Sequence, residues 1–577
     1  MRGVPLGVAV VAAGLYFIGL GTAPFIDPPE GFHAEVARQM GAGHDWITPR
    51  VNGVRYFDKP PLLHWLMAGS FTVAGPTPGA ARFWPALAAV GVAAVTAQLG
   101  MMLGGLRVGL LAGLMVAANL GMFLFGRIVK PDLVFILWVV LAYAGFAIAY
   151  RGGGRGGLVL FYAGFGLAAI SKDLVGALGL LVVVGLFFWL TRERPLGPWI
   201  PWWGVGIIAA VALPWYLAVE AGSRGFLWYT VVDNHVLNFT RQRVFPDEDA
   251  PLGSVEFLVV TLAAFLPWAL ALPWALGRAF RRPWGDATTR LWLLFGLWAV
   301  VLIGFFTLSA FKLPHYGLPA FPALALLVAR VWDETIDGVP RAASPRALLT
   351  PLLVLFALVT AAFAAVWSGL VGIPPDVLAS VDMATRNLAA KGRSAPQSPL
   401  EAWLPILLRG AAIFGLATVV MAVAVWRRAA ALGVGVALAA TIAFLSVVAG
   451  EGMTQFVRAR AALPLTQTLA QRALPGDLIV HEGPLENSAS ALIVLGRGVA
   501  VVNGRQSNLA FGATFPEAKD VFWDPPRLRT AWAAAGRHYL LSTVEPEKSV
   551  VRSLPPERVH LIAAASGRWL YSNMMGP

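Results

Sequence analysis

The sequence predicts a mainly α-helical, polytopic membrane protein with a small soluble α/β domain at its C-terminal end. Of its 577 residues, 58% are hydrophobic and only 13% are charged, which leaves too few polar residues to cover a soluble protein of this size. Apolar runs of about 20 residues, the length that crosses a bilayer as a helix, recur as far as residue 449. Beyond residue 450, the short β-like runs DLIVHEG, GVAVVNG and HYLLSTV alternate with helical stretches.

Thirteen apolar segments are predicted to span the membrane, which makes residues 1–450 a transmembrane domain and residues 451–577 a separate soluble domain. The spans are expected near 4–22, 79–103, 107–126, 132–150, 157–171, 174–191, 200–218, 254–277, 291–309, 316–331, 348–371, 403–425 and 431–449. The first span follows Met1-Arg2, and no small-residue cleavage site precedes Asp27. We therefore expect an uncleaved span and not a signal peptide.

Arginines give the orientation of these spans, because cytoplasmic loops are enriched in Lys and Arg. Alternate connections carry Arg107, Arg151, Arg155, Arg192, Arg194, Arg278, Arg281, Arg282, Arg290, Arg341, Arg346, Arg427 and Arg428. The opposite set of loops is then predicted to lie outside, and comprises 23–78, 127–131, 172–173, 219–253, 310–315, 372–402 and the tail from 451. Every chemically unusual segment falls in this outer set, which predicts a site on the extracytoplasmic face.

Charge and cysteine content exclude several classes of function. A net charge of +13 in a membrane protein favours anionic lipid headgroups and phosphorylated ligands as partners over nucleic acid. The absence of cysteine excludes disulfides, zinc–thiolate sites and thiol nucleophiles.

The first outer loop contains FIDPPEGFHAEVARQM, residues 25–40. Two carboxylates, Asp27 and Glu30, flank a Pro-Pro pair directly after the first span. Phe32, Val36 and Met40 then recur at i, i+4 and i+8, which predicts a helix lying on the membrane surface. The two acids belong either to a solvated turn or to a working acid pair at the membrane face.

Two further outer segments carry isolated charges. In VNGVRYFDKPPLLHWL, residues 51–66, Lys59 follows Asp58 and either snorkels to the interface or supplies a positive charge to a phosphate. Asp132 heads an apolar span, where an acid is either a helix cap or a functional group.

Two later outer segments carry mixed polar groups. Asp233, His235, Arg241 and Arg243 occur within residues 213–245, a combination that suits an anion or metal site. The segment 305–324 carries Ser309, Lys312, His315 and Tyr316. A snorkelling lysine among interfacial aromatics is the plainer interpretation of the second segment.

In their order and wording, these segments resemble the polyprenyl-phosphate-dependent glycosyltransferases of the GT-C class. The branch they resemble most contains the 4-amino-4-deoxy-L-arabinose lipid A transferases and, more distantly, the protein O-mannosyltransferases. The matching positions are Glu30, Ala34-Glu35, Ala37-Arg38, Met40, Asp45-Trp46, Thr48-Pro49-Arg50, Asn52-Gly53, Tyr56-Phe57, Lys59-Pro60-Pro61-Leu62, Asp132, Lys172, His235, Lys312-Leu313-Pro314, Tyr316 and Leu318-Pro319. The resemblance covers residues 1–330, and the remainder agrees only in architecture.

The resemblance implies a GT-C membrane fold and an inverting sugar transfer in the bacterial inner membrane, on its periplasmic face. The donor is a polyprenyl-phosphate-linked sugar, and the acceptor is a lipid, such as a lipid A-like one, or a glycan or other extracytoplasmic molecule. On this resemblance Lys59 matches the family's phosphate-binding lysine. The site roles we expect are catalysis for Glu30, Asp27 and Asp132; donor phosphate binding for Lys59, for Arg241 or Arg243, and for Lys312; the donor and acceptor pocket for His33, Arg50, Tyr56, His315 and Tyr316; and a divalent metal, Zn or Mg, for His235 and for Asp58, which stands where the family usually has Glu.

The sequence departs from the family pattern at its acidic pair, where Pro29 replaces the first acid. Three outcomes follow from this replacement: Glu30 serves as the base, Asp27 has taken over, or transfer is altered or lost. Two other classes of function remain: a transporter or flippase for a lipid-linked anion, which the arginine excess and the many spans would suit, and a catalytically altered family member, which the missing acid would suit.

Overall fold

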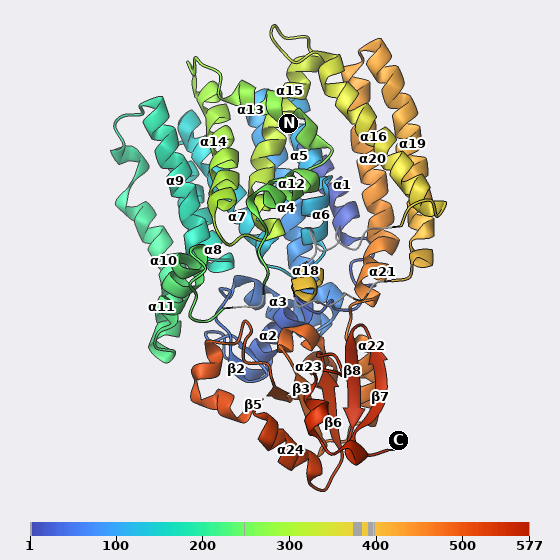
Figure 1. The fold of residues 1–577 in the computed structure, drawn as a ribbon. Helices are drawn as coiled ribbons and strands as arrows, with labels where there is room; N and C mark the ends of the chain where they lie inside the picture. Colours follow the sequence, from blue (N-terminus) through green and yellow to red (C-terminus); the bar gives the residue numbers. More distant parts are fainter. Residues whose placement is uncertain (1–2, 247–248, 373–382, 391–395, 397, 576–577) are drawn as a thin grey trace.

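The computed structural model describes all residues except 1–2, 247–248, 373–382, 391–395, 397 and 576–577. Long helices form a bundle at one end of the molecule, and a six-stranded sheet lies at the other (Figure 1). The predicted fold class, a helical membrane protein with a small C-terminal α/β unit, is confirmed. Much of the predicted outer segment 372–402 lies outside the described residues.

Every predicted span overlaps a helix of the bundle. The bundle helices are α1 (Gly3–Phe17), α4 (Pro78–Gly104), α5 (Leu106–Ala117), α6 (Leu120–Gly126), α7 (Asp132–Ile148), α8 (Gly154–Ser171), α9 (Leu174–Thr191), α10 (Trp202–Gly222), α12 (Ser254–Ala264), α13 (Leu272–Ala279), α14 (Ala287–Leu308), α15 (Phe321–Ile336), α16 (Pro345–Trp367), α19 (Leu404–Arg427) and α20 (Ala430–Val447). The chain is thus a multi-pass membrane protein.

Length and composition support fewer spans than the thirteen predicted. Within the described residues, seven helical segments are long and apolar enough to cross a membrane, or nine if each of two bent pairs is one span. The bends are 61° between α5 and α6 and 106° between α12 and the segment Trp268–Ala279. That count takes α7 and α8 as one segment, although Gly152, with φ of 92°, breaks the helix between them. Helix α1, with 15 residues, is shorter than a full span.

The C-terminal sheet has the strand order β5-β4-β3-β6-β8-β7. Its strands are β3 (Leu478–Glu482), β4 (Ala500–Val502), β5 (Phe522–Trp523), β6 (His538–Ser542), β7 (His560–Ala565) and β8 (Arg568–Ser572). The pairs among β5, β4, β3 and β6 are parallel, and β8 pairs antiparallel with β6 and β7. The three predicted β-like runs form β3, β4 and β6, the central strands. Helices α22 (Leu463–Arg472), α23 (Ser490–Leu495) and α24 (Pro525–Ala533) complete this part of the chain.

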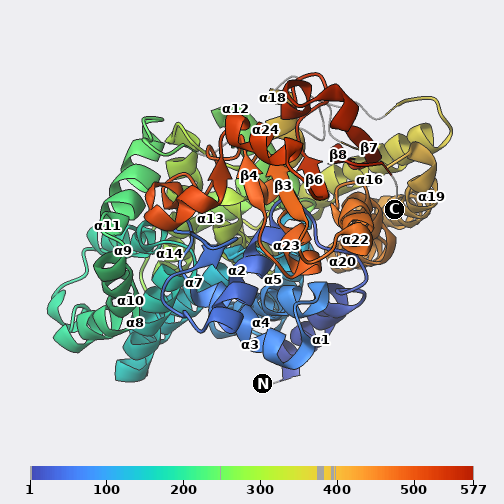
Figure 2. The same cartoon turned by 90° about the horizontal axis from the view of Figure 1, so that it is seen from below.

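The first outer loop lies between the bundle and the sheet (Figures 1 and 2). It contains α2 (Glu30–Gly43), the hairpin β1 (Arg50–Val51) and β2 (Val54–Arg55), and α3 (Leu62–Ala74). Asn52 and Gly53, with φ of 53° and 79°, form the two-residue turn for which Asn-Gly is favoured.

The predicted helix at Phe32, Val36 and Met40 is confirmed as α2, but its place on the membrane surface is not. Its apolar side packs in one core with buried residues of the C-terminal part, among them Leu485 and Leu492. Burial against another part of the protein satisfies the same apolar stripe that a membrane surface would satisfy.

Candidate active site

Three half-buried lysines, Lys59, Lys130 and Lys172, come from separate outer segments and lie close enough for their charges to interact. Lys59 follows the β1–β2 hairpin, Lys130 precedes α7, and Lys172 lies between α8 and α9. Burial lowers the pKa of Lys130, and the positive charges of Lys172 and Lys59 act in the same direction. Asp132 and Asp249 oppose this lowering. Like charges this close together favour an anion as their shared ligand.

Asp132 is the carboxylate at the centre of this group. It is 2% exposed and is the first residue of α7, whose N-cap position is occupied by Pro131. Its Oδ1 accepts a hydrogen bond from the Lys172 ammonium at 2.6 Å and lies 3.8 Å from His315 Nε2. The helix-cap interpretation of Asp132 is therefore wrong in this structure, because the carboxylate turns toward cations of the site.

Three buried histidines line the same region. His33 Nδ1 and His64 Nε2 share a hydrogen bond of 3.1 Å, and the His33 ring packs edge-on against Tyr56. Burial is the main cause that lowers the pKa of His33 well below its ordinary value, and the nearby His64 lowers it further. Burial also lowers the pKa of His315. These imidazoles are accordingly neutral near pH 7, so the fixed positive charge of the site comes from the lysines.

Aromatic side chains complete the wall around the lysines. The Lys172 ammonium lies 5.1 Å from the Tyr316 ring centroid, and the Lys130 ammonium lies 5.6 Å from that of Phe125. The His315 ring packs at 5.0 Å against Phe125. The structure thus brings Lys59, Asp132, His33, Tyr56, His315 and Tyr316 of the predicted site to one region.

Asp58 and His235 line a small adjoining cavity together with Lys172 and Asp173. Asp58 accepts a hydrogen bond from the Tyr229 hydroxyl, and His235 Nδ1 faces the Thr230 carbonyl. Burial alone would lower the pKa of His235, but its contact with Asp173, 3.4 Å from Nε2, outweighs burial and raises the pKa.

These contacts do not fit a metal site at Asp58 and His235. Both side chains have protein partners, and a raised pKa disfavours the neutral imidazole that binds metal. In the part of the chain that the structure describes, no group of three or more His, Cys, Asp or Glu side chains is arranged to hold a metal ion. Asp58 and His235, as the structure places them, thus do not fit the predicted divalent metal.

Glu30 is held in a buried network of hydrogen bonds. Its carboxylate is fully buried and accepts from Arg82 Nε at 2.8 Å and Nη2 at 2.5 Å. The backbone N–H groups of Ile26 and Val129 donate to it at 2.9 and 3.0 Å. Arg82 also donates to the carbonyls that follow α1, those of Leu20, Ala23 and Pro24. Four donors leave Glu30 poorly placed to take a proton from a substrate.

Asp27 joins the outer loop to the C-terminal part of the chain. It is 2% exposed, and its carboxylate accepts from the Ser490 backbone N–H at 3.0 Å and from the Ser490 hydroxyl, at the start of α23. Burial raises the pKa of Asp27, and the nearby Arg568 opposes that rise. Asp27 is therefore part of the junction between loop and sheet.

Gly31 packs tightly against this junction, which gives a first testable prediction. A Cβ at Gly31 would lie 2.4 Å from Asp27 Oδ1 and 2.4 Å from the Ser490 nitrogen. We expect Gly31→Ala to destabilise the full-length protein by about 1–3 kcal/mol, as overpacking does. The control is Gly43→Ala on the same helix, where a Cβ meets nothing within 4 Å. Equal thermal unfolding midpoints for the two variants would contradict the tight junction.

The other predicted cations have partners of their own. Arg50 Nη1 lies 3.1 Å from Glu517 in the C-terminal part, and Arg243 Nε lies 3.2 Å from Asp233. Lys312 donates to the Ser254 hydroxyl at 2.8 Å, and Arg241 donates to the Ala310 carbonyl at 3.1 Å. The contacts of Arg50, Arg241 and Lys312 connect different segments of the chain, whereas that of Arg243 lies within the outer segment 219–253.

The sequence prediction gave no site role to Lys130, Lys172, Asp173 or His64, although Lys172 is among the positions that match the family. Lys130 stands two residues before Asp132 in Lys-Pro-Asp, and the pair Lys172-Asp173 interrupts two apolar runs, so both carried a local signal. His64 carried none, because its partner His33 lies 31 residues away.

Comparisons with known proteins agree with this fold. The family described as dolichyl-phosphate-mannose-protein mannosyltransferase matches residues 32–230. One relative is the undecaprenyl phosphate-alpha-4-amino-4-deoxy-L-arabinose arabinosyl transferase of Enterobacter sp. (strain 638). It is 29% identical over 343 residues, and this aligned part makes up 58% of this chain and 59% of the relative's length. A Sodalis glossinidius protein of the same name, numbered 2, is 28% identical over 90% of this chain and 88% of its own length.

Solved structures show the same architecture. The crystal structure of ArnT from Cupriavidus metallidurans bound to undecaprenyl phosphate is 22% identical, covers 99% of each chain and has a TM-score of 0.78. Its apo state covers 99% of this chain and 98% of that one, with a TM-score of 0.79. The chain therefore has the fold of a GT-C membrane glycosyltransferase and resembles the 4-amino-4-deoxy-L-arabinose transferases and the protein mannosyltransferases.

Proposed function

We propose that this protein transfers a sugar from a polyprenyl-phosphate donor to a lipid, such as a lipid A-like one, or to another extracytoplasmic acceptor. The observation that carries the proposal is the group of Lys59, Lys130 and Lys172 around Asp132. The names of the arabinosyl transferases it resembles specify an undecaprenyl phosphate sugar, and ArnT was solved with undecaprenyl phosphate bound. Both support a lipid-phosphate donor.

The lysines supply what the departing phosphate needs. When the bond between the sugar's anomeric carbon and the phosphate oxygen breaks, its electron pair stays on that oxygen and negative charge on the phosphate grows. Ammonium groups already fixed near that oxygen stabilise the transition state more than the ground state. The neutral histidines and aromatic rings limit water around the charges, which strengthens the effect.

Asp132 is the carboxylate we assign to proton transfer. An acceptor hydroxyl attacks the anomeric carbon on the side opposite the phosphate, and its proton passes to the Asp132 carboxylate as the new bond forms. This displacement inverts the anomeric centre and releases polyprenyl phosphate. Glu30 and Asp27, the other predicted acids, act as structural groups because both carboxylate oxygens of each accept hydrogen bonds from the protein, whereas the contacts of Asp132 with Lys172 and His315 are made through Oδ1.

We place the protein in the bacterial inner membrane, with the site and residues 451–577 on the periplasmic face. The arginine-rich connections, among them those of Arg278 to Arg282 and of Arg427 and Arg428, support this orientation. Membrane lipids then surround the bundle, and donor and acceptor meet beneath the sheet domain.

Labelled sugar transfer tests the proposal against transport. Membranes containing the protein are given a panel of polyprenyl-phosphate donors with radiolabelled sugars, and two quantities are measured: label on acceptors and intact labelled donor in the opposite leaflet. We expect label on an acceptor with wild type, Glu30→Gln and Asp27→Asn to the extent that they fold, and loss with Lys59→Ala. Movement of intact donor without transfer would instead identify a flippase.

A further inference from the structure

A cavity of about 310 Å³ lies at the end of the bundle away from the sheet. It is formed by the end of α13 and the connection to α14, the end of α15, and the connection that follows α15. Five arginines line it: Arg278, Arg281, Arg282, Arg330 and Arg341. Its volume is within the range of small-molecule binding sites.

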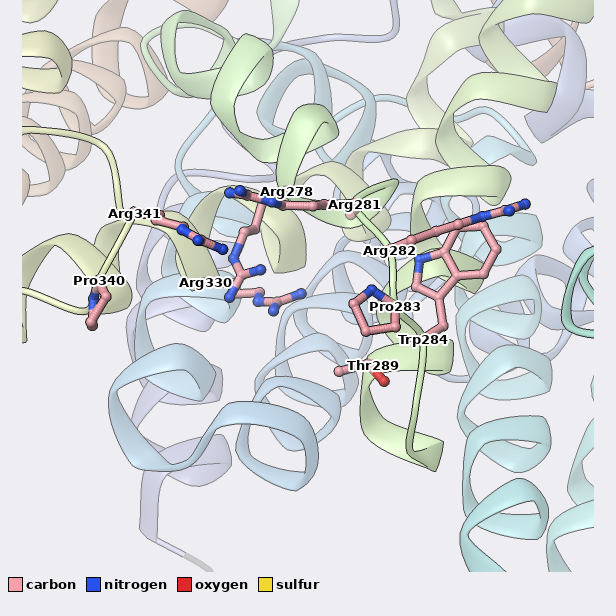
Figure 3. A pocket seen from close by; sticks show the side chains of 10 residues that line it. Arg278, Arg281, Arg282, Pro283, Trp284, Thr289, Arg330, Pro340 and Arg341 are labelled. Carbon is pink, nitrogen blue, oxygen red and sulfur yellow. The ribbon is translucent and has the colours of Figure 1, made fainter.

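Four of the guanidinium groups converge in this cavity (Figure 3). Arg278, Arg281, Arg330 and Arg341 point toward one another, whereas Arg282 points away and lies 4.9 Å above the Trp284 ring centroid. The positive-inside rule explains why arginines occur in these cytoplasmic loops. It does not require side chains from three separate segments to meet.

One carboxylate orients part of this cluster but does not neutralise it. Glu334 accepts from Arg278 Nε and from Arg330 Nε, each at 2.8 Å. Arg330 also lies 4.9 Å from the Trp292 ring centroid, which fixes its plane. Because Glu334 engages the Nε atoms, the terminal nitrogens of both guanidiniums are left to bind another acceptor.

The converging charges need a counter-anion. Even with Glu334 and the further charge of Asp286, which acts on Arg330, the four guanidiniums keep a net positive charge and repel one another, and an anion with several acceptor oxygens removes that repulsion. A tetrahedral phosphate presents oxygens in several directions, which suits arginines that arrive from several sides.

We propose that the cavity lined by Arg278, Arg281, Arg330 and Arg341 binds a phosphate monoester carrying two negative charges, at the membrane face opposite the catalytic site. The group belongs either to a lipid headgroup or to a soluble phosphate compound, which share this chemistry. Basic cavities between membrane helices on the cytoplasmic side bind anionic headgroups in this way. The proposal is independent of the transfer reaction.

Binding to purified full-length protein in detergent tests the site. Native mass spectrometry counts bound short-chain phosphatidic acid, with phosphatidylcholine for comparison, and calorimetry at low salt measures inorganic phosphate. The variant is Arg281→Gln with Arg341→Gln, two exposed residues at the cavity rim. The control is Arg427→Gln with Arg428→Gln, the same charge change in an exposed connection at the same end.

We expect wild type and control to bind one phosphatidic acid, and the double rim variant to bind it roughly tenfold to hundredfold more weakly. Tight binding of inorganic phosphate that is also lost in the rim variant would identify a soluble source. The proposal would be overturned if the rim variant bound phosphatidic acid as tightly as wild type, if wild type bound phosphatidylcholine as tightly as phosphatidic acid, or if wild type bound neither phosphatidic acid nor inorganic phosphate.

Discussion

Replacing Asp132 by Asn is expected to lower sugar transfer by about 100- to 10,000-fold, the range for loss of a general base. The substitution keeps the size of the side chain and its position at the start of α7, but the amide accepts no proton from an acceptor hydroxyl. Turnover of the purified variant with saturating donor and acceptor measures the effect. Asp520→Asn, at an exposed position of the C-terminal part, is the matched control.

Donor binding separates a role in proton transfer from a merely structural one. Removing the carboxylate also removes the 2.6 Å ion pair that competes with phosphate for Lys172. We therefore expect Asp132→Asn to bind undecaprenyl phosphate at least as tightly as wild type while turnover is lost. Loss of binding and turnover together would show that Asp132 only maintains the shape of the site.

Replacing Glu30 by Ala is expected to destabilise the protein by about 3–5 kcal/mol, because it leaves the buried Arg82 guanidinium without its carboxylate. The side chain of Arg82 is only 4% exposed, so water cannot take over the lost contacts. Denaturant unfolding in detergent measures the change, with Glu557→Ala at an exposed position as control.

A second variant distinguishes this structural role from catalysis. In Glu30→Ala with Arg82→Ala, both partners of the buried pair are absent, so part of the lost stability is expected to return. If Glu30→Ala instead folds as stably as wild type and abolishes transfer, Glu30 is the base and the assignment of Asp132 is wrong.

Much of the fold could be predicted because its signals are local. Apolar runs placed every bundle helix, and the three β-like runs marked the central strands of the sheet. The Asn52-Gly53 turn needs only its own two residues to be predicted. The number of spans could not be predicted from such signals, because α1 is shorter than its apolar run and α7 and α8, predicted as two spans, count as one segment.

The roles of the acids could not be predicted in the same way, because their partners are distant in sequence. Glu30 meets Arg82 across 52 residues, and Asp27 meets Ser490 across 463. The sequence of the first outer loop marks both acids as candidates. Only the tertiary contacts show that their oxygens already accept hydrogen bonds from other parts of the protein. Asp132 and Lys59 were singled out from sequence, whereas Lys130 became visible only when three outer segments met.

The measurement that tests the central claim most directly is the affinity for undecaprenyl phosphate of a triple variant, Lys59→Gln, Lys130→Gln and Lys172→Gln. Lys519→Gln with Lys548→Gln, at exposed positions of the C-terminal part, serves as control. If the three lysines hold the donor phosphate, the triple variant binds about 100-fold or more weakly, while the control matches wild type. A dissociation constant for the triple variant equal to that of wild type would contradict the account.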